Sequence, residues 1–413
     1  MNRLLVCTIF TLHLSFPLVV HANDPISLND HGASLLEKGR GAGLLRLQEA
    51  YRSNPYDETI RRNLAIGFVV EGEKSLAAGR LEEAEDRFSR AVELFPDDGD
   101  FRLYHAISLH ALKRYDHAEV EYDQAVARIG ETKGYLFHLG RLRYDTGRLD
   151  EAISLWEKGL SLDPSDRELQ RLVEKTRKER IAESSMERGG SGRFSISYDL
   201  SIPTEIASGL LDLLEEAYNR VGSFLDHYPE ARVPVLVYTR RSFQEVVNGP
   251  DWSGGVYDGK IRLPLGGVRS ITPEVKALLF HEYAHVVVFS LTRGNVPMWL
   301  NEGIAEMMAR TQFSPPPAHH SDPGPPLSRS LLEGSFSRLP AEDARRAYLQ
   351  SHLLVTYIAG RFGSHTLGDL LRRLGEGGEI PQTFDTLFSP LGLTYDQLFE
   401  EWGKTIASPA TFP

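Results

Sequence analysis

The pattern of apolar and polar residues divides this multidomain chain into parts of different structure. From about residue 30 to 185, apolar residues recur at helical spacing, and the pattern repeats along this stretch. Short alternating or continuous apolar runs, typical of strands, appear after residue 193, and from about residue 272 the spacing is helical again. The pattern therefore predicts an all-α solenoid followed by an α+β domain with a mostly helical C-terminal half.

The first part contains a repeat with a period of 34 residues. Each copy has an alanine, an aromatic residue four positions later and a second small residue three positions after that. The three copies are Ala84, Phe88 and Ala91; Ala118, Tyr122 and Ala125; and Ala152, Trp156 and Gly159. The period and these positions resemble tetratricopeptide repeats, in which pairs of helices stack into a solenoid.

This resemblance implies a concave groove for a peptide or a partner protein, with Leu44 to Pro55 as a degenerate second helix that caps the stack. A scaffold without a ligand is the alternative, and the repeated alanines and aromatics are expected to be core residues in either case. We expect the tetratricopeptide repeat domain to cover residues 30–185. The Ser- and Gly-rich residues 186–192 are predicted to be a linker to a second domain at 193–408.

The second domain is predicted to contain a small sheet and a central helix. Lys260 to Leu265 lies in a Gly-flanked, hairpin-like stretch and is predicted to be an edge strand, either a plain structural edge or one that pairs with an extended peptide. Thr272 and Pro273 provide an N-cap and a first-turn proline for the central helix. The other elements expected here are a strand at Arg193–Tyr198, a helix at Thr204–His227 and a buried strand at Val233–Tyr238.

Six prolines between residues 315 and 326 predict that residues 311–340 form a long loop without regular structure. Such a loop is either a lid over a cleft or a surface excursion. His319 and His320 within it are candidate metal ligands, but solvated loop histidines are the simpler interpretation. Four helical patterns follow, from Ala341 to about Ala407.

The composition is typical of a soluble globular protein, with 413 residues of which 41% are hydrophobic and 25% charged. Residues 1–22 resemble a signal peptide, because Arg3 precedes a mostly apolar stretch and Val20-His21-Ala22 forms a small-residue cleavage site. We expect cleavage near Ala22, a secreted or periplasmic location and no membrane span afterwards. Polar residues and Pro17 interrupt the stretch, which argues against a membrane anchor.

Removal of the signal peptide also limits the chemistry of the remaining chain. Cys7 is the only cysteine and would leave with that segment, so any metal must be held by His, Asp or Glu. Loss of Arg3, its one charged residue, takes the net charge from −11 to −12. With this charge and without a basic cluster containing aromatics, nucleic acid is not an expected partner.

The candidate chemistry lies in the stretch Ala277 to Phe289, which reads ALLFHEYAHVVVF. A helix of this sequence is apolar nearly all round and therefore buried, so its polar residues His281, Glu282 and His285 need partners. Two histidines four residues apart lie on one helix face, which suits two imidazoles that converge on one metal ion. Glu302 in the next predicted helix completes a set of three ligands, with a fourth position open for water.

These two motifs, His281-Glu282-x-x-His285 and Trp299-Leu300-Asn301-Glu302-Gly303, resemble those of gluzincin zinc peptidases, and most closely the peptidase MA-like group. The resemblance implies one Zn²⁺ per chain, Glu302 as the third ligand and Glu306 as a residue that orients a ligand histidine. A helix-surface charge remains the alternative for Glu306. Val288 and Leu291 stand where the metzincin pattern requires a glycine and a third histidine.

A tyrosine is expected to stabilise the oxyanion. Tyr348 and Tyr357 lie on one predicted helix, and nine residues at ~100° each place them on opposite faces, so only one faces the metal. Their spacing resembles the catalytic-tyrosine helix of aminopeptidase N-like enzymes, which implies that Tyr348 acts and that Tyr357 is a core residue. His352 is the second candidate for the donor.

The sequence thus predicts an exported zinc metallopeptidase that hydrolyses peptide bonds, with repeats that bind the substrate or a protein partner. Glu282 would be the general base that takes a proton from the attacking water, and Tyr348 would stabilise the oxyanion. No Gly-x-Met-Glu-Asn stretch precedes the central helix, so an endopeptidase is favoured over an aminopeptidase. The alternatives are an inactive zinc-binding scaffold and a latent enzyme closed by the proline-rich loop.

Overall fold

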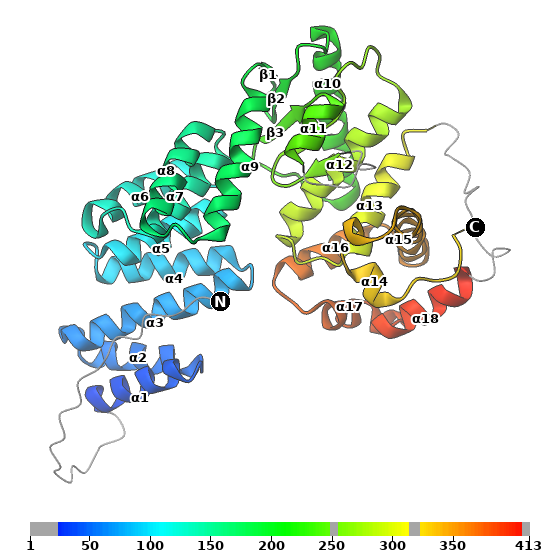
Figure 1. The fold of residues 1–413 in the computed structure, drawn as a ribbon. Coiled ribbons are helices and arrows are strands. Elements are labelled where there is room, and N and C mark those ends of the chain that lie inside the picture. Colours follow the sequence, from blue (N-terminus) through cyan, green and yellow to red (C-terminus); the bar gives the residue numbers. More distant parts are fainter. Residues whose placement is uncertain (1–23, 248–254, 314–322, 407–413) are drawn as a thin grey trace.

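The computed structural model describes residues 24–247, 255–313 and 323–406, which form a helical repeat domain beside a C-terminal domain built around a small sheet (Figure 1). The predicted fold class is confirmed. The residues of the predicted signal peptide, as well as His319 and His320, lie outside the described residues. Within the described ranges, every helix is too short or too polar to cross a membrane.

The repeat domain consists of antiparallel helix pairs that stack in sequence order and end on a single helix (Figure 1). Acidic side chains start several of its helices: Asp57, Asp98 and Asp166 each accept backbone N–H groups at the first turn of α3, α5 and α9. The helices are α1 (Pro25–Glu37), α2 (Ala42–Ser53), α3 (Glu58–Ala77), α4 (Leu81–Leu94), α5 (Gly99–Ala111), α6 (Tyr115–Ile129), α7 (Lys133–Asp145), α8 (Leu149–Leu162) and α9 (Arg167–Glu183).

The small and aromatic residues of the repeat are packing positions, as predicted. Phe88 and Trp156 are fully buried, and each ring lies against a glycine of the preceding helix. A Cβ atom on Gly72 would lie 2.6 Å from the Phe88 ring, and one on Gly140 would overlap the Trp156 indole. The stretch from Leu44 to Pro55 lies mainly in α2, which packs on α1 as the second helix of a further pair.

The C-terminal domain has a five-stranded sheet with the order β1-β2-β3-β5-β4. The three inner strands are parallel to one another, and each edge strand is antiparallel to its neighbour. In β3, Val235 and Val237 face the main core, whereas Leu236 faces α9 and α11 on the other side. The strands are β1 (Glu187–Gly190), β2 (Phe194–Tyr198), β3 (Val233–Val237), β4 (Val256–Tyr257) and β5 (Ile261–Leu263).

Three of the predictions for this domain are wrong. The predicted linker 186–192 contains β1, which pairs with β2 and belongs to the sheet. The predicted edge strand Lys260–Leu265 contains β5, which is paired on both sides, because β4 adds to its outer side. The segment 311–340 is not wholly irregular, since it contains a short helix at Arg329–Glu333 and a 3₁₀ turn at Phe336–Arg338.

The central helix, α12, begins where the sequence predicts. Thr272 accepts a hydrogen bond from the Val275 N–H at its start, and Arg293 ends it in the left-handed conformation, with φ of 54°. The helices of this domain are α10 (Thr204–Leu225), α11 (Arg240–Val246), α12 (Pro273–Thr292), α13 (Met298–Arg310), α14 (Arg329–Glu333), α15 (Ala341–Phe362), α16 (His365–Gly375), α17 (Ile380–Phe388) and α18 (Tyr395–Ile406).

A buried network of polar groups joins the repeats to the sheet. The guanidinium of Arg262 on β5 is fully buried and lies 3.2 Å from the carboxylate of Glu179 on α9, which is also fully buried. Arg262 also donates to the hydroxyl groups of Tyr144 on α7, at 3.1 Å, and of Tyr238, at 2.7 Å, and to Asp258, at 3.1 Å. The last repeat helices and the β4–β5 hairpin are therefore held as one unit.

Replacement of Arg262 by Met is expected to lower the free energy of unfolding by about 3–5 kcal/mol, because the buried Glu179 would keep only the more distant charge of Lys175, at 3.6 Å. Urea unfolding followed by circular dichroism measures this change. The double variant Arg262→Met, Glu179→Gln should be less destabilised than Arg262→Met alone, since the uncompensated charge is gone.

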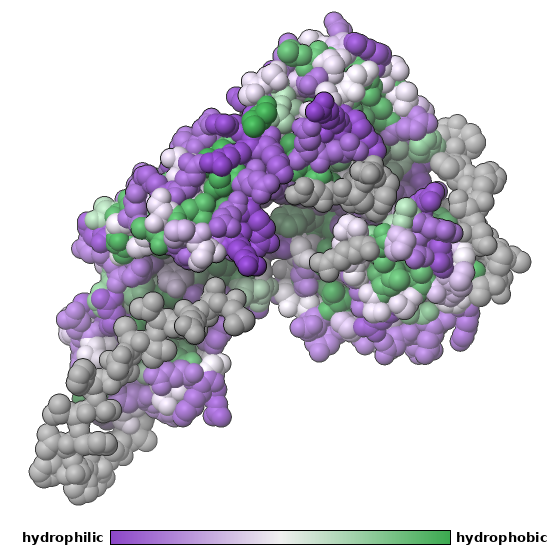
Figure 2. Space-filling model, viewed as in Figure 1, coloured by the Kyte–Doolittle hydropathy of each residue, from purple (hydrophilic) through white to green (hydrophobic). Residues whose placement is uncertain are grey.

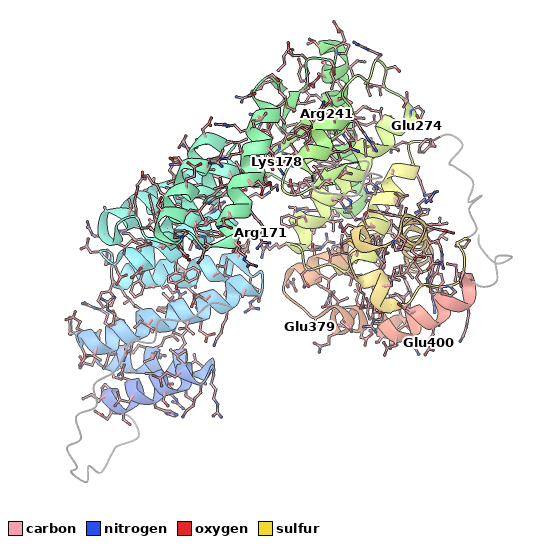
Figure 3. The ribbon with its side chains drawn as sticks, in the orientation of Figure 1. Arg171, Lys178, Arg241, Glu274, Glu379 and Glu400 are labelled. Carbon is pink, nitrogen blue, oxygen red and sulfur yellow. The ribbon has the colours of Figure 1, made fainter. Side chains whose placement is uncertain are left out.

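The matched control is Arg241→Met. Arg241, labelled in Figure 3, pairs with Glu245 on the exposed surface of α11, where the arginine side chain is 89% accessible. Replacement of Arg241 should lower the free energy of unfolding by less than about 1 kcal/mol. Equal effects of Arg262→Met and Arg241→Met would contradict a stabilising role for the buried network.

Candidate metal centre

The structure brings together His281 and His285 of α12 and Glu302 of α13. Glu302 Oε2 lies 3.4 Å from His281 Nε2 and 3.5 Å from His285 Nε2, and one possible ligand atom from each residue lies within 4.8 Å of the others. Tetrahedral zinc with bonds of about 2.0–2.1 Å holds its ligand atoms about 3.3 Å apart. Two imidazole nitrogens and a carboxylate oxygen at these separations fit such an ion.

Each histidine has an oxygen next to its second ring nitrogen. Glu306 Oε1 lies 3.4 Å from His281 Nδ1, and Asn301 Oδ1 lies 3.0 Å from His285 Nδ1. Both oxygens favour a proton on Nδ1, which leaves Nε2 directed at Glu302 and able to bind a metal. Of the two roles considered for Glu306, this geometry favours orientation of the ligand histidine.

Asn301 is a residue that the motif analysis did not assign. Its position directly before the predicted ligand Glu302 indicates a role at the metal site, because side-chain oxygens commonly accept a hydrogen bond from the second N–H of a ligand histidine. The pairing joins α13 to α12, however, so it depends on how the two helices pack.

The charges in this cluster depend on one another. Burial alone would raise the pKa of the Glu302 carboxyl, but the imidazoles of His285 and His281 hold it below its usual value. Burial would conversely lower the pKa of His281, yet Glu302 and Glu306 raise it well above its usual value. An ionised carboxylate among imidazoles is a site where a bound cation replaces the protons.

Glu282 occupies the inner side of the site. Only 3% of its surface is exposed, and burial raises the pKa of its carboxyl. Its Oε2 has no hydrogen-bond partner among the residues that the structure describes. Gly255, directly before the edge strand β4, approaches so closely that a Cβ atom there would lie 2.5 Å from Glu282 Oε1. A carboxylate that is not one of the three converging ligands thus faces the edge of the sheet.

Tyr348 of α15 lies on the wall of the same cavity, with its ring centroid 6.4 Å from that of His281. Burial raises the pKa of its hydroxyl, which remains a hydrogen-bond donor at neutral pH. Phe336 packs edge-on against Tyr348 at 5.4 Å, so the end of the proline-rich segment supports this wall. His352, the second candidate, is buried on the same helix but is not among the described residues that line the cavity.

The prediction that Tyr357 is a core residue is only partly correct, because its half-buried ring packs against the main core while its hydroxyl group lies near the surface. Its hydroxyl is 2.8 Å from Glu401 and 2.6 Å from Arg361, on the half-buried outer side of α15. The helical phase correctly separates it from Tyr348, but the side of α15 opposite the metal centre faces α18 and solvent.

Gly303 allows α13 to approach α15. A Cβ atom at this position would overlap the backbone carbonyl of Ser351 and lie 2.5 Å from Val355. A larger residue would push the helix that carries Glu302 away from the helix that carries Tyr348. Close packing of α13 against α15 therefore explains the glycine in the middle of α13.

The cavity over the three candidate ligands has a volume of about 670 Å³. Glu282 and Tyr348 line it together with the β4–β5 hairpin and the outer face of α12. The arrangement combines an open position beside the ligands, a buried base and a hydroxyl donor. These are the groups needed to add water to a polarised carbonyl.

Comparison with known families agrees with this organisation. Residues 227–408 match the Peptidase MA superfamily, and residues 71–133 and 134–166 match two tetratricopeptide repeat families. The first match covers the central helix and all three candidate ligands.

Known proteins are similar to parts of this chain. The Hsp70-Hsp90 organizing protein of Triticum aestivum is 33% identical over 98 residues, which is 24% of this chain and 17% of that protein. The small glutamine-rich tetratricopeptide repeat-containing protein 2 of Mycosarcoma maydis is 27% identical over 32% of this chain and 36% of that protein. A solved structure, the first tetratricopeptide domain of Spaghetti (RPAP3) bound to an HSP90 peptide, is 23% identical over 28% of this chain and 93% of that chain, with a TM-score of 0.27.

Replacement of Asn301 by Ala is expected to weaken zinc binding about 10–100-fold, because His285 would lose the oxygen that orients its ring. Competition with a chromophoric chelator measures the affinity. Asn219→Ala on α10, where the amide bonds only a backbone carbonyl of its own helix, is the control and should leave the affinity unchanged. Equal affinities for the two variants would show that Asn301 does not support the site.

Proposed function

We propose that this chain, which joins tetratricopeptide repeats to a Peptidase MA superfamily domain, is an exported zinc-dependent metallopeptidase that hydrolyses internal peptide bonds. The observation that carries the proposal is the convergence of His281, His285 and Glu302 on one point beside the buried Glu282. His281, His285 and Glu302 would hold the zinc, and the remaining position would face the cavity.

Bound zinc would act as a Lewis acid toward the scissile carbonyl. Glu282 takes a proton from the attacking water as the oxygen–carbon bond forms, and it then delivers that proton to the leaving amine as the carbon–nitrogen bond breaks. Its burial favours the protonated form that this second step requires. The net reaction adds one water and produces a carboxylate and an amine.

Tyr348 supplies a hydrogen bond to the carbonyl oxygen as negative charge develops there. Its hydroxyl stays protonated because its pKa is raised by burial, and its ring lies on the cavity wall beside His281. Glu306 and Asn301 hold the two ligand imidazoles in place.

The alternative interpretation is a structural zinc site, and such sites usually have four protein ligands. The group found among the described residues offers three. A structural site also gives no role to Glu282, whose burial costs free energy. Both points favour the catalytic proposal over the scaffold.

The repeats are proposed to bind a protein. This chain is 33% identical over 98 residues to the Hsp70-Hsp90 organizing protein, whose name describes a role with other proteins. For this chain the partner is proposed to be the polypeptide substrate or a second protein that delivers it.

Export is proposed from residues 1–22. Expression of the full chain in a Gram-negative bacterium should give a periplasmic protein whose first residue is Asn23, as determined by N-terminal sequencing. An intact N-terminus on a cytosolic protein would contradict export.

Replacement of Glu282 by Gln tests the proposed function directly. Cleavage of a mixed peptide library should fall by about 10²–10⁴-fold, because the amide cannot accept the proton of the attacking water. Elemental analysis should still give one zinc per chain, since Glu282 is not among the three ligands. Undiminished cleavage by Glu282→Gln would reject this mechanism.

Replacement of Tyr348 by Phe should lower the turnover number about 10²–10³-fold without loss of zinc, because one donor to the developing oxyanion is removed. Tyr357→Phe removes a hydroxyl from the opposite face of the same helix, where it contacts Glu401, and serves as the control. Its turnover should match that of the unmodified protein. A similar loss in both variants would indicate a general effect on α15 instead.

A further inference from the structure

The repeat domain and the C-terminal domain touch at a second place, distant in sequence from the Arg262 network. Arg293, at the end of α12, donates to the backbone carbonyl of Gly79 at 2.6 Å and to the carboxylate of Glu82 at 2.6 and 2.8 Å. The turn between α16 and α17 approaches the same repeat, since a Cβ atom on Gly377 would lie 2.7 Å from the Ala78 carbonyl. The α3–α4 turn is thus held against the end of the central helix.

A large groove lies between the two domains, with a volume of about 1260 Å³. The repeats line one side with the α3–α4 turn and the end of α5, including Ala111. The C-terminal domain lines the other side with the outer face of α12, the segment 227–231 and the start of α17, where Glu379 is labelled in Figure 3. Figure 2 shows this hollow between the two domains, with hydrophobic residues at its back. Sites for small molecules are usually about 300–1,000 Å³, so this groove has room for a longer ligand.

The groove lies next to the cavity of the candidate metal centre. Tyr257, Phe289, Thr292 and Val296 line both. The combined cleft reaches from the Arg262 network, which borders the metal-site cavity, to the contact made by Arg293, which borders the groove. Both contacts between the domains therefore lie along one cleft that contains the metal centre.

Phe289 marks the junction of the two spaces. It follows His281 and His285 at positions i, i+4 and i+8, so the three side chains lie along one face of α12. Its side chain is 43% exposed on a helix in which most residues are buried, and its ring packs edge-on against Tyr257 of β4 at 6.0 Å. Phe289, with the half-buried Tyr257 against it, offers a surface for an apolar side chain two helical turns from the first ligand.

The charged residues of the groove are of both signs. Its lining contains Glu82, Glu230, Glu333 and Glu379 as well as lysine and arginine residues. A groove with both signs of charge and apolar surface between them suits a polypeptide of mixed composition and would repel nucleic acid at the carboxylates.

We propose that this groove receives an extended segment of the polypeptide substrate on one side of the scissile bond, with an apolar side chain against Phe289 and Tyr257. The inference rests on the proposed peptidase function and adds that the repeats form one wall of the substrate cleft. Because the two domains are joined at both places along the cleft, the groove admits an unfolded or terminal segment and excludes a folded domain.

The experiment attaches a bulky group to one wall of the groove. In a chain carrying Cys7→Ser, which removes the only native cysteine, Ala111→Cys places a thiol at an exposed position on the groove wall. Ala127→Cys places one at an equally exposed alanine of α6 that is not among the described lining residues, and it is the matched control. Each variant is coupled to a polyethylene glycol maleimide.

Two substrates with the same cleavage sequence are compared, one of about 5 residues and one of about 20 residues, which extend over roughly 17 and 65 Å. The label at Ala111→Cys should lower kcat/KM for the long substrate at least tenfold and leave the short substrate within twofold. The label at Ala127→Cys should change neither value. Equal cleavage of the long substrate by the two labelled variants would overturn the proposal and leave the peptidase function intact.

A binding measurement separates this proposal from the proposed function. In the Glu282→Gln background, fluorescence anisotropy measures the affinity for the fluorescein-labelled long peptide without hydrolysis. A loss of affinity on labelling at Ala111→Cys but not at Ala127→Cys would support the groove even if the unmodified protein cleaved nothing, in which case only the hydrolytic function would fail. Unchanged affinity, or no binding of the long peptide, would overturn the groove.

Discussion

The structure depends on one constraint, the burial of a converging set of imidazoles and carboxylates between two apolar helices. Burial of such groups costs several kcal/mol unless each finds a partner. Here Glu302 Oε2 lies within 3.5 Å of both imidazole Nε2 atoms, whereas Glu282 Oε2 has no hydrogen-bond partner among the described residues. Glu302 Oε2 therefore lies at the place where the two imidazoles converge and a cation would bind. The outer partners, Glu306 and Asn301, hold the imidazoles, and Gly303 sets the distance between α13 and α15. The surrounding fold positions this set.

The repeats are joined to the part of the C-terminal domain that contains the metal centre. The fully buried pair of Arg262 and Glu179 joins β5 to α9, and β5 carries the edge strand β4 that covers Glu282. The hydroxyl of Tyr144 connects α7 to the same network. Movement of the last repeat would therefore be transmitted to the strand that borders the metal centre. A protein bound to the repeats would in this way affect access to the cleft.

Local patterns in the sequence predict the features that depend on residues close together in the chain. The 34-residue period of small and aromatic residues identifies the repeats, and the four-residue spacing of His281 and His285 places both on one helix face whatever the tertiary structure. Glu302 could be assigned because its helix directly follows.

Strand order could not be predicted in the same way: β1 follows α9 without an alternating pattern in its residues, and the inner position of β5 depends on pairing with β3 from a distant segment. Helical phase separates Tyr348 from Tyr357 but does not say that the second faces solvent. The Arg262 network joins residues up to 118 positions apart, beyond the reach of any local pattern.

We propose that hydrolysis of peptide bonds by this chain requires zinc held by α12 and α13. The most direct measurement is mass-spectrometric identification of the products that the purified chain releases from a peptide library, before removal of metal by a chelator, after removal, and after restoration with one equivalent of Zn²⁺. The account predicts internal cleavage that disappears on removal and returns with zinc. Cleavage that persists in the metal-free protein, or a zinc-loaded protein that releases no products, would contradict it.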